Sequence, residues 1–398
     1  MIYFYSFYGI SPSNSLIQII RSAPDQPRGL AVFDMDQDGK NELFMSTENV
    51  YDGCIYVGED YYPNNMTWDG FTSCLGTSYS EDYWISISHG NYSGNLSLFV
   101  EDWGSDDKGE LFEMYWDGSN YAFRQITPPD SSERWYGRLN YINSMPSCDM
   151  DGDGLDELGV SSDHGGVGSG GGGIFIVEWN GTDYVTHEVY VNTSYGEGWY
   201  GGSSMDKDED GLCEYYTMSE VDGSLWEVYW DGSAYTYIVH YLPDSIGSKK
   251  GFIVACGNVT NEGMACYQAT YESGGDSNII QWKWNGSDFE VTNILNITEL
   301  DYTYAIAVGD IDVDGLNELL VGGSGESATT ECLNVIDKET GTWTNTQIGC
   351  TQAGYNGDVG VYDADKNSVN EVYFGSYVGT TKFWGILKVL NRNTKIMP

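Results

Sequence analysis

One ten-residue acidic pattern recurs along the chain and constrains its fold more than any other feature. In "DIDVDGLNEL" (310–319) three aspartates alternate with other residues, a glycine follows, and a glutamate stands at the ninth position. Four further segments share the pattern: 34–43, 149–158, 206–215 and 363–372. Two degenerate copies, 89–98 and 258–267, occupy the gaps, so that consecutive copies begin 52 to 60 residues apart. Such a period predicts a repeat architecture, and we number its repeats and acidic loops 1 to 7 in chain order.

Each repeat has the same order of β-forming segments. An alternating apolar run precedes the acidic pattern and a second follows it, as in "YAIAVG" and "ELLVGG" of repeat 6. A third segment leads into an Asn-Gly or Asp-Gly turn, and a fourth leaves it; such turns lie at 115–121, 178–184, 229–235 and 283–289. These dipeptides are the strongest short-range signal for a β-hairpin. With almost no helical periodicity, the pattern predicts an all-β, seven-bladed β-propeller with four-stranded blades.

The two ends of the chain must share one blade, because the residues before 34 and after 363 together exceed one repeat. We expect "LIQII" (16–20) to form the outer strand of the last blade, beside "FWGILKVL" (383–390). The propeller then covers 14–398, and 1–13 form an N-terminal extension rich in apolar and aromatic residues. Two hypotheses follow for the extension. It folds back on its own propeller, or it adds to the next subunit and produces a homo-oligomeric ring or head-to-tail filament.

Carboxylates placed this closely repel one another unless a hard cation lies among them. Ca²⁺ takes about six to eight oxygen ligands, and each loop offers side chains at positions 1, 3, 5 and 9 and a main-chain carbonyl at position 7. A solvated acidic turn is the alternative for any single copy. The predicted ligand sets are Asp34, Asp36, Asp38, Lys40 and Glu42; Asp149, Asp151, Asp153, Leu155 and Glu157; Asp206, Asp208, Asp210, Leu212 and Glu214; Asp310, Asp312, Asp314, Leu316 and Glu318; and Asp363, Asp365, Asn367, Val369 and Glu371. We therefore expect about five structural calcium ions.

The repeated loop resembles the FG-GAP/VCBS repeat family, to which the seven-bladed head of integrin alpha chains belongs. The resemblance covers about residues 14–398 and rests on the acidic positions of the five loops. It implies structural calcium between the first two strands of a blade. Loop 7 departs from the pattern, because Ser368 stands where the others have glycine. Loops 2 and 5 lack the acids, and we expect them to be free of calcium.

The cysteines and the glycosylation sequons indicate an extracellular or cell-surface protein. Eight cysteines without a C-x-x-C pair favour disulfides over metal binding. We expect three bonds, each flanking a turn or loop: Cys54–Cys74, Cys256–Cys266 and Cys332–Cys350. Two other cysteines, Cys148 and Cys213, either link neighbouring blades or are buried free thiols. Eight sequons are candidates for N-glycosylation: Asn65, Asn91, Asn95, Asn180, Asn192, Asn258, Asn285 and Asn296.

Charge and hydropathy exclude several classes of partner. The chain has 60 acidic and 17 basic residues, a formal net charge of −43, which argues against nucleic acid and against anionic membrane surfaces. No apolar run is long enough for a transmembrane helix. The four histidines (His89, His164, His187 and His240) share no position in the repeat, and we expect them to be surface or packing residues.

The sequence contains no serine-nucleophile, zinc-protease or phosphate-loop motif, so we predict a protein without catalytic residues. We interpret the chain as a secreted, calcium-stabilised glycoprotein with a structural or adhesive role. Two alternatives remain open. A carbohydrate-binding lectin would need repeated aromatic pockets for a glycan ligand. A polysaccharide lyase or hydrolase would need acid, base and Arg or Lys gathered at one place, and that cluster is not visible in the sequence.

Overall fold

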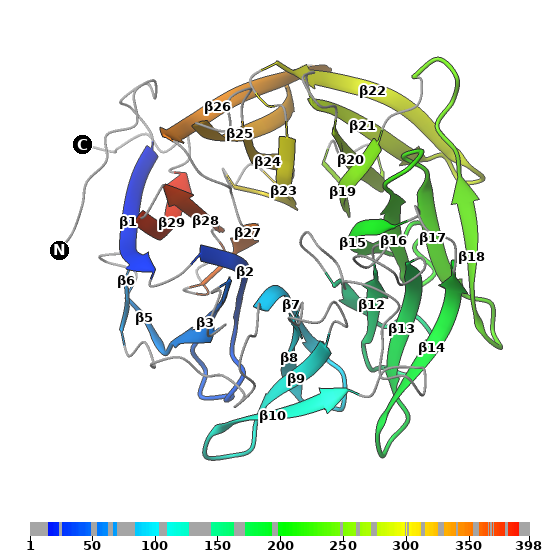
Figure 1. Ribbon diagram of the computed structural model, residues 1–398. Helices are drawn as coiled ribbons and strands as arrows, with labels where there is room; N and C mark the ends of the chain where they lie inside the picture. The colour runs from blue at the N-terminus through cyan, green and yellow to red at the C-terminus, as the bar shows by residue number, and fades with distance from the viewer. Residues whose placement is uncertain are drawn as a thin grey trace.

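The computed structural model contains strands arranged as sheets around a ring (Figure 1). The structure describes residues 15–23, 26–48, 54–62, 67–69, 84–102, 110–126, 145–162, 172–192, 198–246, 250–259, 263–271, 277–298, 300, 302–311, 315–324, 330–339, 341–352, 358–364, 366, 368, 370–378 and 381–389. Within these ranges every regular element is a β-strand. No helix that meets the length and hydropathy of a membrane span occurs in this part of the chain.

Six sheets have four antiparallel strands each. Repeats 2 and 3 form β7 (Trp84–Asn91), β8 (Leu96–Asp102), β9 (Glu110–Trp116) and β10 (Tyr121–Ile126), then β11 (Ser147–Cys148), β12 (Glu157–Ser161), β13 (Gly173–Trp179) and β14 (Tyr184–Val191). Repeats 4 and 5 form β15 (Trp199–Met205), β16 (Glu214–Ser219), β17 (Leu225–Trp230) and β18 (Tyr235–His240), then β19 (Lys250–Gly257), β20 (Ala265–Tyr271), β21 (Ser277–Trp284) and β22 (Phe289–Ile297). Repeat 6 forms β23 (Tyr302–Gly309), β24 (Glu318–Ser324), β25 (Thr330–Glu339) and β26 (Thr342–Gln352). Repeat 7 forms β27 (Asp358–Tyr362), β28 (Glu371–Val378) and β29 (Thr381–Val389) and is completed by β1 (Ser15–Ala23).

The first strand of each sheet lies nearest the centre of the ring and the last lies outside (Figure 1). First strands of adjacent sheets are in contact all the way round: β2 (Gln26–Phe33) with β7, β7 with β11, β11 with β15, β15 with β19, β19 with β23, β23 with β27, and β27 with β2. This closed, radial arrangement is that of a β-propeller. The predicted all-β propeller fold is therefore confirmed.

The chain ends share one sheet, as predicted. β1 pairs antiparallel with β29 in a register that runs from Ser15 opposite Val389 to Ala23 opposite Lys382. "LIQII" therefore forms the outermost strand beside the segment that begins at 383. The Tyr362 hydroxyl donates a 2.8 Å hydrogen bond to the Leu30 carbonyl, joining the last repeat to the first.

Repeat 1 departs from the predicted four strands. Among the described residues its sheet contains only β2, β3 (Glu42–Glu48) and β4 (Cys54–Gly58). The chain then forms a separate two-stranded ladder of β5 (Asp60–Tyr62) and β6 (Thr67–Asp69). Repeats 2 to 5 close their third and fourth strands with an Asn-Gly or Asp-Gly turn, whereas here the sequence between β5 and β6 is Pro-Asn-Asn-Met. Repeat 1 therefore lacks the dipeptide that forms this turn in repeats 2 to 5.

The hydrophobic core lies between neighbouring sheets, because successive side chains of a strand point to opposite faces. Phe44 and Ile55 of repeat 1 pack with Leu98 and Phe112 of repeat 2 in one cluster. The next residue of β8, Phe99, packs on the other face against the sheet of repeat 3. Burying a large apolar side chain contributes about 1.5–3 kcal/mol, so each sheet stabilises both of its neighbours.

Removal of β1 should destabilise the whole ring. A chain that begins at Gln26 leaves the outer edge of β29 without its partner strand, and we expect its Tm in scanning calorimetry to fall by about 10 °C or more. The matched control begins at Ser15 and should melt like the full chain. Equal Tm values for the two truncated chains would contradict closure by β1.

Candidate metal loops and inter-sheet sites

The five acidic loops occupy the same place in their sheets. Each connects the first strand to the second, and its ninth-position glutamate is the first residue of that second strand. Because antiparallel strands alternate in direction, the turns between third and fourth strands lie at the same edge of the sheets as the loops. One face of the ring therefore carries both the acidic loops and the Asn-Gly and Asp-Gly turns.

Two hydrogen bonds recur in all five loops. The ninth-position Oε2 accepts a bond from the second-position backbone N–H, at 2.7, 2.7, 3.2, 2.8 and 3.1 Å from the nitrogens of Met35, Met150, Lys207, Ile311 and Ala364. The first-position Oδ2 accepts a bond from the sixth-position N–H, at 3.0, 3.1, 2.9, 3.0 and 2.6 Å from the nitrogens of Gly39, Gly154, Gly211, Gly315 and Ser368. The repeated geometry shows that the sequence pattern encodes one loop structure.

The sixth position requires a left-handed backbone. Gly39 has φ of 95° and Gly315 has φ of 88°, values that glycine adopts without steric cost. In loop 7, Ser368 adopts φ of 66° at the same position. Loop 7 therefore keeps the bend and its hydrogen bond despite the missing glycine, at a cost of about 1–2 kcal/mol.

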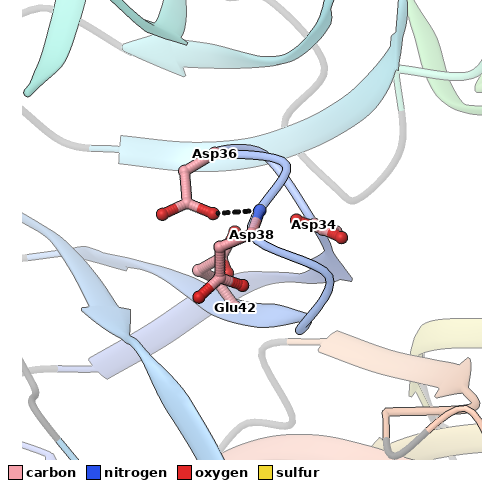
Figure 2. Close-up of side chains that lie close together, drawn as sticks. All are labelled: Asp34, Asp36, Asp38 and Glu42. Carbon is pink, nitrogen blue, oxygen red and sulfur yellow. Dashed lines mark hydrogen bonds between the residues drawn. The ribbon is translucent and has the colours of Figure 1, made fainter. Parts of the chain in front are cut away.

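The acidic side chains converge in the three loops whose ligand positions are all described. In loop 1 one carboxylate oxygen from each of Asp34, Asp36, Asp38 and Glu42 lies within 4.8 Å of the others (Figure 2). The same holds in loop 3 for Asp149, Asp151 and Glu157, and in loop 4 for Asp206, Asp208 and Asp210. Five further predicted ligands lie outside the described residues: Asp312, Asp314, Asp365, Asn367 and Val369.

The ninth-position glutamates of loops 1 and 3 are held in an environment that disfavours negative charge. Glu42 is 1% exposed, and burial raises its pKa to about 8; Asp36 and Asp34 add to the shift, against a hydrogen bond from Met35. Burial likewise raises the pKa of Glu157 to about 8. A cation among these carboxylates would reverse the repulsion, and an all-oxygen donor set is the kind that Ca²⁺ prefers. The residues present in loops 1 and 3 therefore fit calcium.

Loop 4 contains an internal cation that the sequence analysis missed. The Lys207 ammonium contacts Glu227 of β17 and lies 3.4 Å from Glu214 Oε1. It also lies 5.1 Å from the ring centroid of Trp284 in repeat 5. The predicted ligand Glu214 is thus paired with a lysine, which replaces the methionine found at the second position in loops 1 and 3.

The eighth position of the loop contacts the preceding repeat, which sequence reasoning also missed. Nδ2 of Asn41, Asn317 and Asn370 donates to the first-position carbonyl of the loop before it, at 3.1, 2.9 and 2.8 Å from the carbonyl oxygens of Asp363, Asn258 and Asp310. In loop 3, Asp156 Oδ2 accepts a 2.7 Å bond from the Asn91 backbone N–H. In loop 4 the eighth residue is Cys213. Asparagine at this position in three loops was the available sequence signal.

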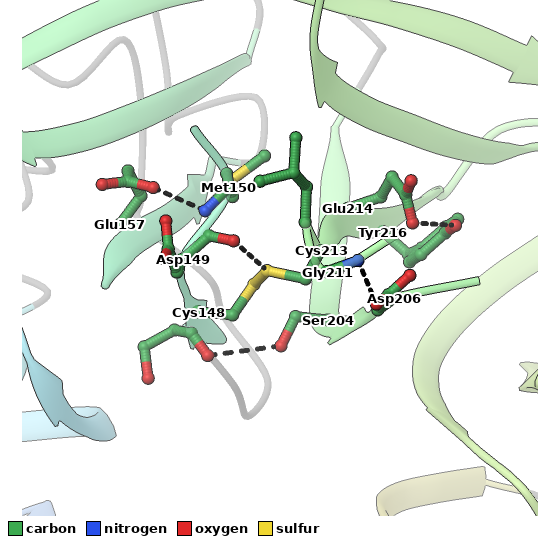
Figure 3. Close-up of a disulfide and its surroundings, with 12 residues drawn as sticks. Cys148, Asp149, Met150, Glu157, Ser204, Asp206, Gly211, Cys213, Glu214 and Tyr216 are labelled. Carbon is green, nitrogen blue, oxygen red and sulfur yellow. Dashed lines mark hydrogen bonds between the residues drawn. A yellow bond between two sulfur atoms is a disulfide. The ribbon is translucent and has the colours of Figure 1, made fainter. Parts of the chain in front are cut away.

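Disulfides are present at two predicted places. Cys256 and Cys266 are bonded and lie opposite each other on β19 and β20, which confirms the predicted clamp on loop 5. Cys148 and Cys213 are bonded and link repeats 3 and 4, so they are not free thiols (Figure 3).

The other four cysteines are described only in part. Cys332 is disulfide-bonded and its backbone lies opposite Cys350, whose side chain is outside the described part of the chain. Cys54 is also disulfide-bonded, and its predicted partner Cys74 lies outside the described residues.

The sequons differ in accessibility. Asn180 and Asn285 are exposed at hairpin turns, where Oδ1 of each accepts hydrogen bonds from the residues that follow. Asn95 and Asn296 are exposed as well, and Asn192 is half-buried. The sequons of the degenerate loops, Asn91 and Asn258, are half-buried with a buried Oδ1. Asn65 lies outside the described residues.

A cluster of charged and aromatic side chains lies at the seam between repeats 2 and 3. The Arg124 guanidinium carbon lies 5.4, 5.2 and 5.6 Å from the ring centroids of Tyr115, Trp179 and Tyr184. Arg124 Nε is 3.6 Å from Oε2 of the buried Glu113, whose Oε1 accepts a 2.7 Å bond from the Tyr184 hydroxyl. The Arg124 side chain is 37% exposed, so this seam is open to solvent.

Related clusters lie at the next two seams. His187 Nε2 lies 2.8 Å from Glu178 Oε2, which also accepts a bond from the Tyr235 hydroxyl of repeat 4. His240 Nε2 lies 3.0 Å from Glu227 Oε2, and its ring packs against Phe289 of repeat 5.

These two histidines pair with carboxylates at their seams, and they occupy different positions in their repeats. His89, in contrast, is a packing residue, stacked 4.8 Å from Phe33. His164 lies outside the described residues.

Comparison with known proteins identifies the fold but no family. No protein-family model matches the chain, and no curated protein matches its sequence. Among solved structures, the chain is similar to the BP39L lectin of Burkholderia pseudomallei, with a TM-score of 0.60 and 10% sequence identity. The similarity covers 92% of this chain and 96% of the lectin. At this identity the likeness shows the propeller fold alone.

Replacement of Lys207 by methionine should destabilise the protein. Lys207→Met leaves Glu227 buried beside Glu214 without the ammonium, and removing one partner of a buried ion pair costs about 3–5 kcal/mol. We expect denaturant unfolding to show a loss of this size. Lys250→Met is the control, because Lys250 is exposed and 4.0 Å from Glu220, a pair worth about 1 kcal/mol or less. A similar small loss in both variants would contradict the role of Lys207.

Proposed function

We propose that this protein is an extracellular, calcium-stabilised β-propeller that binds carbohydrate. The single observation that supports carbohydrate binding best is the solvent-open seam at Arg124, where a guanidinium, a buried carboxylate and three aromatic rings converge. Ligand sites combine apolar and aromatic walls with a few fixed polar groups. The similar propeller from Burkholderia pseudomallei is named a lectin, which agrees with this choice.

The chemistry of the seam fits a neutral sugar. Aromatic faces of Trp179 and Tyr115 suit the apolar C–H faces of a pyranose ring, and the Arg124 donors suit hydroxyl oxygens. The buried Glu113 holds the Tyr184 hydroxyl and lies beside Arg124, so it orients the groups of the seam. The net charge of −43 repels acidic sugars, so we favour neutral hexoses as ligands.

Calcium is proposed for the acidic loops because their donor sets and bends fit it. Loops 1 and 3 gather carboxylates around one point and bury a glutamate whose pKa is raised without a cation. Bound calcium would supply positive charge there, and Asp36, Asp151 and their neighbours would hold it. The same pattern supports the resemblance to FG-GAP/VCBS repeats and a count of seven blades, with the sheet of repeat 1 as a shortened blade.

An extracellular setting is supported by the disulfides and by exposed sequons such as Asn180 and Asn285. A structural or adhesive role is compatible with sugar binding, because a lectin is itself an adhesive module. Assembly through residues 1–13 stays a prediction, since they lie outside the described residues. A lyase or hydrolase stays the less favoured reading, and an activity screen on polysaccharides tests it.

The carbohydrate proposal predicts a loss of glycan binding on a conservative change in the seam. Arg124→Lys keeps the positive charge but removes the planar fork of donors, and we expect binding on a glycan array to weaken about tenfold or more. Lys338→Arg, at another cation that lies over a tryptophan, is the matched control and should bind normally. Failure of the unaltered protein to bind any glycan would refute the proposal.

The calcium proposal predicts metal-dependent stability. Binding to the folded state alone contributes about 2.7 kcal/mol per site at a hundred times Kd, so a chelator should lower the Tm by many degrees. Asp36→Asn should reduce the calcium stoichiometry, measured by calorimetric titration, by one ion. Asp183→Asn, in an exposed turn outside the loops, is the control and should leave it unchanged. Unchanged Tm in chelator would overturn the assignment.

A further inference from the structure

The eighth-position contacts form a chain that runs in one direction round the ring. In five loops the eighth residue reaches back to the loop of the preceding repeat. In loops 1, 6 and 7 the acceptor is the first-position carbonyl. In two of these three contacts the first residue is an aspartate, Asp363 or Asp310, whose carboxylate is a proposed calcium ligand. The contact therefore fixes the backbone of one loop's ligand by means of the next loop.

Loops 3 and 4 show this contact between two fully described acidic loops (Figure 3). Cys213, the eighth residue of loop 4, donates its backbone N–H to the Asp149 carbonyl at 3.2 Å. Its sulfur is bonded to Cys148, the residue directly before Asp149. Asp149 Oδ2 in turn accepts the Gly154 N–H that closes loop 3. The first-position residue of loop 3 is thus held by loop 4 on one side and by its own loop on the other.

The three asparagine contacts and the disulfide are two ways of attaching the eighth residue of a loop to the preceding loop. A side-chain amide makes the contact at Asn41, Asn317 and Asn370, and a covalent bond makes it at Cys213. Asparagine at position 213 would therefore have a carbonyl acceptor within reach, at Asp149. A variant with asparagine at position 213 therefore lacks the disulfide but keeps a contact with the preceding loop, so it distinguishes the role of the position from the general effect of a disulfide on stability.

We propose that the eighth residue is a positioning residue that couples calcium binding in its own loop to the preceding loop. The inference rests on the proposed calcium sites, including loop 4, where Asp206, Asp208 and Asp210 converge while Lys207 pairs with Glu214. It adds that the sites are not independent. An ion in loop 3 orders Asp149, whose carbonyl and neighbouring Cys148 hold loop 4 at Cys213. By linkage, an ion in loop 4 must favour an ion in loop 3 by the same factor.

The test uses hydrogen–deuterium exchange of the 206–214 segment as free calcium is raised, because its midpoint reports loop 4 alone. Asp151→Asn disables loop 3, and in the otherwise unaltered chain we expect it to shift the loop 4 midpoint about fivefold, the worth of one hydrogen bond. The same change is then made in Cys148→Ser/Cys213→Ala and in Cys148→Ser/Cys213→Asn. The shift should become smaller with alanine, which keeps only the backbone bond from residue 213 to the Asp149 carbonyl, and should recover with asparagine, whose side-chain amide can donate a second bond. The 34–42 segment of loop 1 is the internal control and should keep its midpoint.

Each of the other outcomes of this experiment contradicts one part of the proposal. If Asp151→Asn leaves the loop 4 midpoint unchanged in the otherwise unaltered chain, the loops are independent and the coupling is wrong while calcium binding stands. If the alanine and asparagine variants behave alike, the eighth position has no special role. If calcium changes the exchange of neither segment, the calcium proposal fails, and the coupling fails with it.

Discussion

Repulsion between neighbouring carboxylates is the constraint that shapes each acidic loop. The backbone responds by turning N–H groups inward. Asp34 accepts from Gly39, and Glu42 accepts from Met35. These bonds join the end of the first strand to the start of the second, because Glu42 is the first residue of β3. The same hydrogen bonds therefore stabilise the carboxylates and hold the first two strands together. The residues that make these bonds recur in five repeats.

Features that depend on the repeat pattern could be predicted from the sequence. The period of the acidic pattern indicated the repeats, and Asn-Gly at 180–181 indicated a hairpin. Counting residues within one repeat placed β1 beside β29. Cys256 and Cys266 were predictable because they flank a loop of known type, and the ladder places them opposite each other. In each case the information lies in the pattern that the repeats share.

Features that depend on contacts between repeats could not be predicted in the same way. Asn370 is separated from Asp310 by 60 residues and Tyr184 from Glu113 by 71. No periodicity within a repeat reveals such a partner. Lys207 was missed for a related reason: its ammonium pairs with Glu227 on another strand, while its sequence neighbours suggested only an acidic loop.

Several of the few basic side chains of this acidic protein lie at the seams between repeats, where they pair with buried glutamates. A buried glutamate is costly unless it is paired, and burial alone would raise the pKa of Glu227; hydrogen bonds from His240 and Lys207 outweigh that effect and lower it. Lys207 belongs at once to loop 4 and to the seam with repeat 5, where it lies over Trp284. A change in the charge of loop 4 therefore directly changes the electrostatic environment at the seam. Loop 4 and the seam with repeat 5 therefore share a residue, and the ion pairs of Lys207 with Glu214 and Glu227 connect the acidic loop to the packing between two repeats.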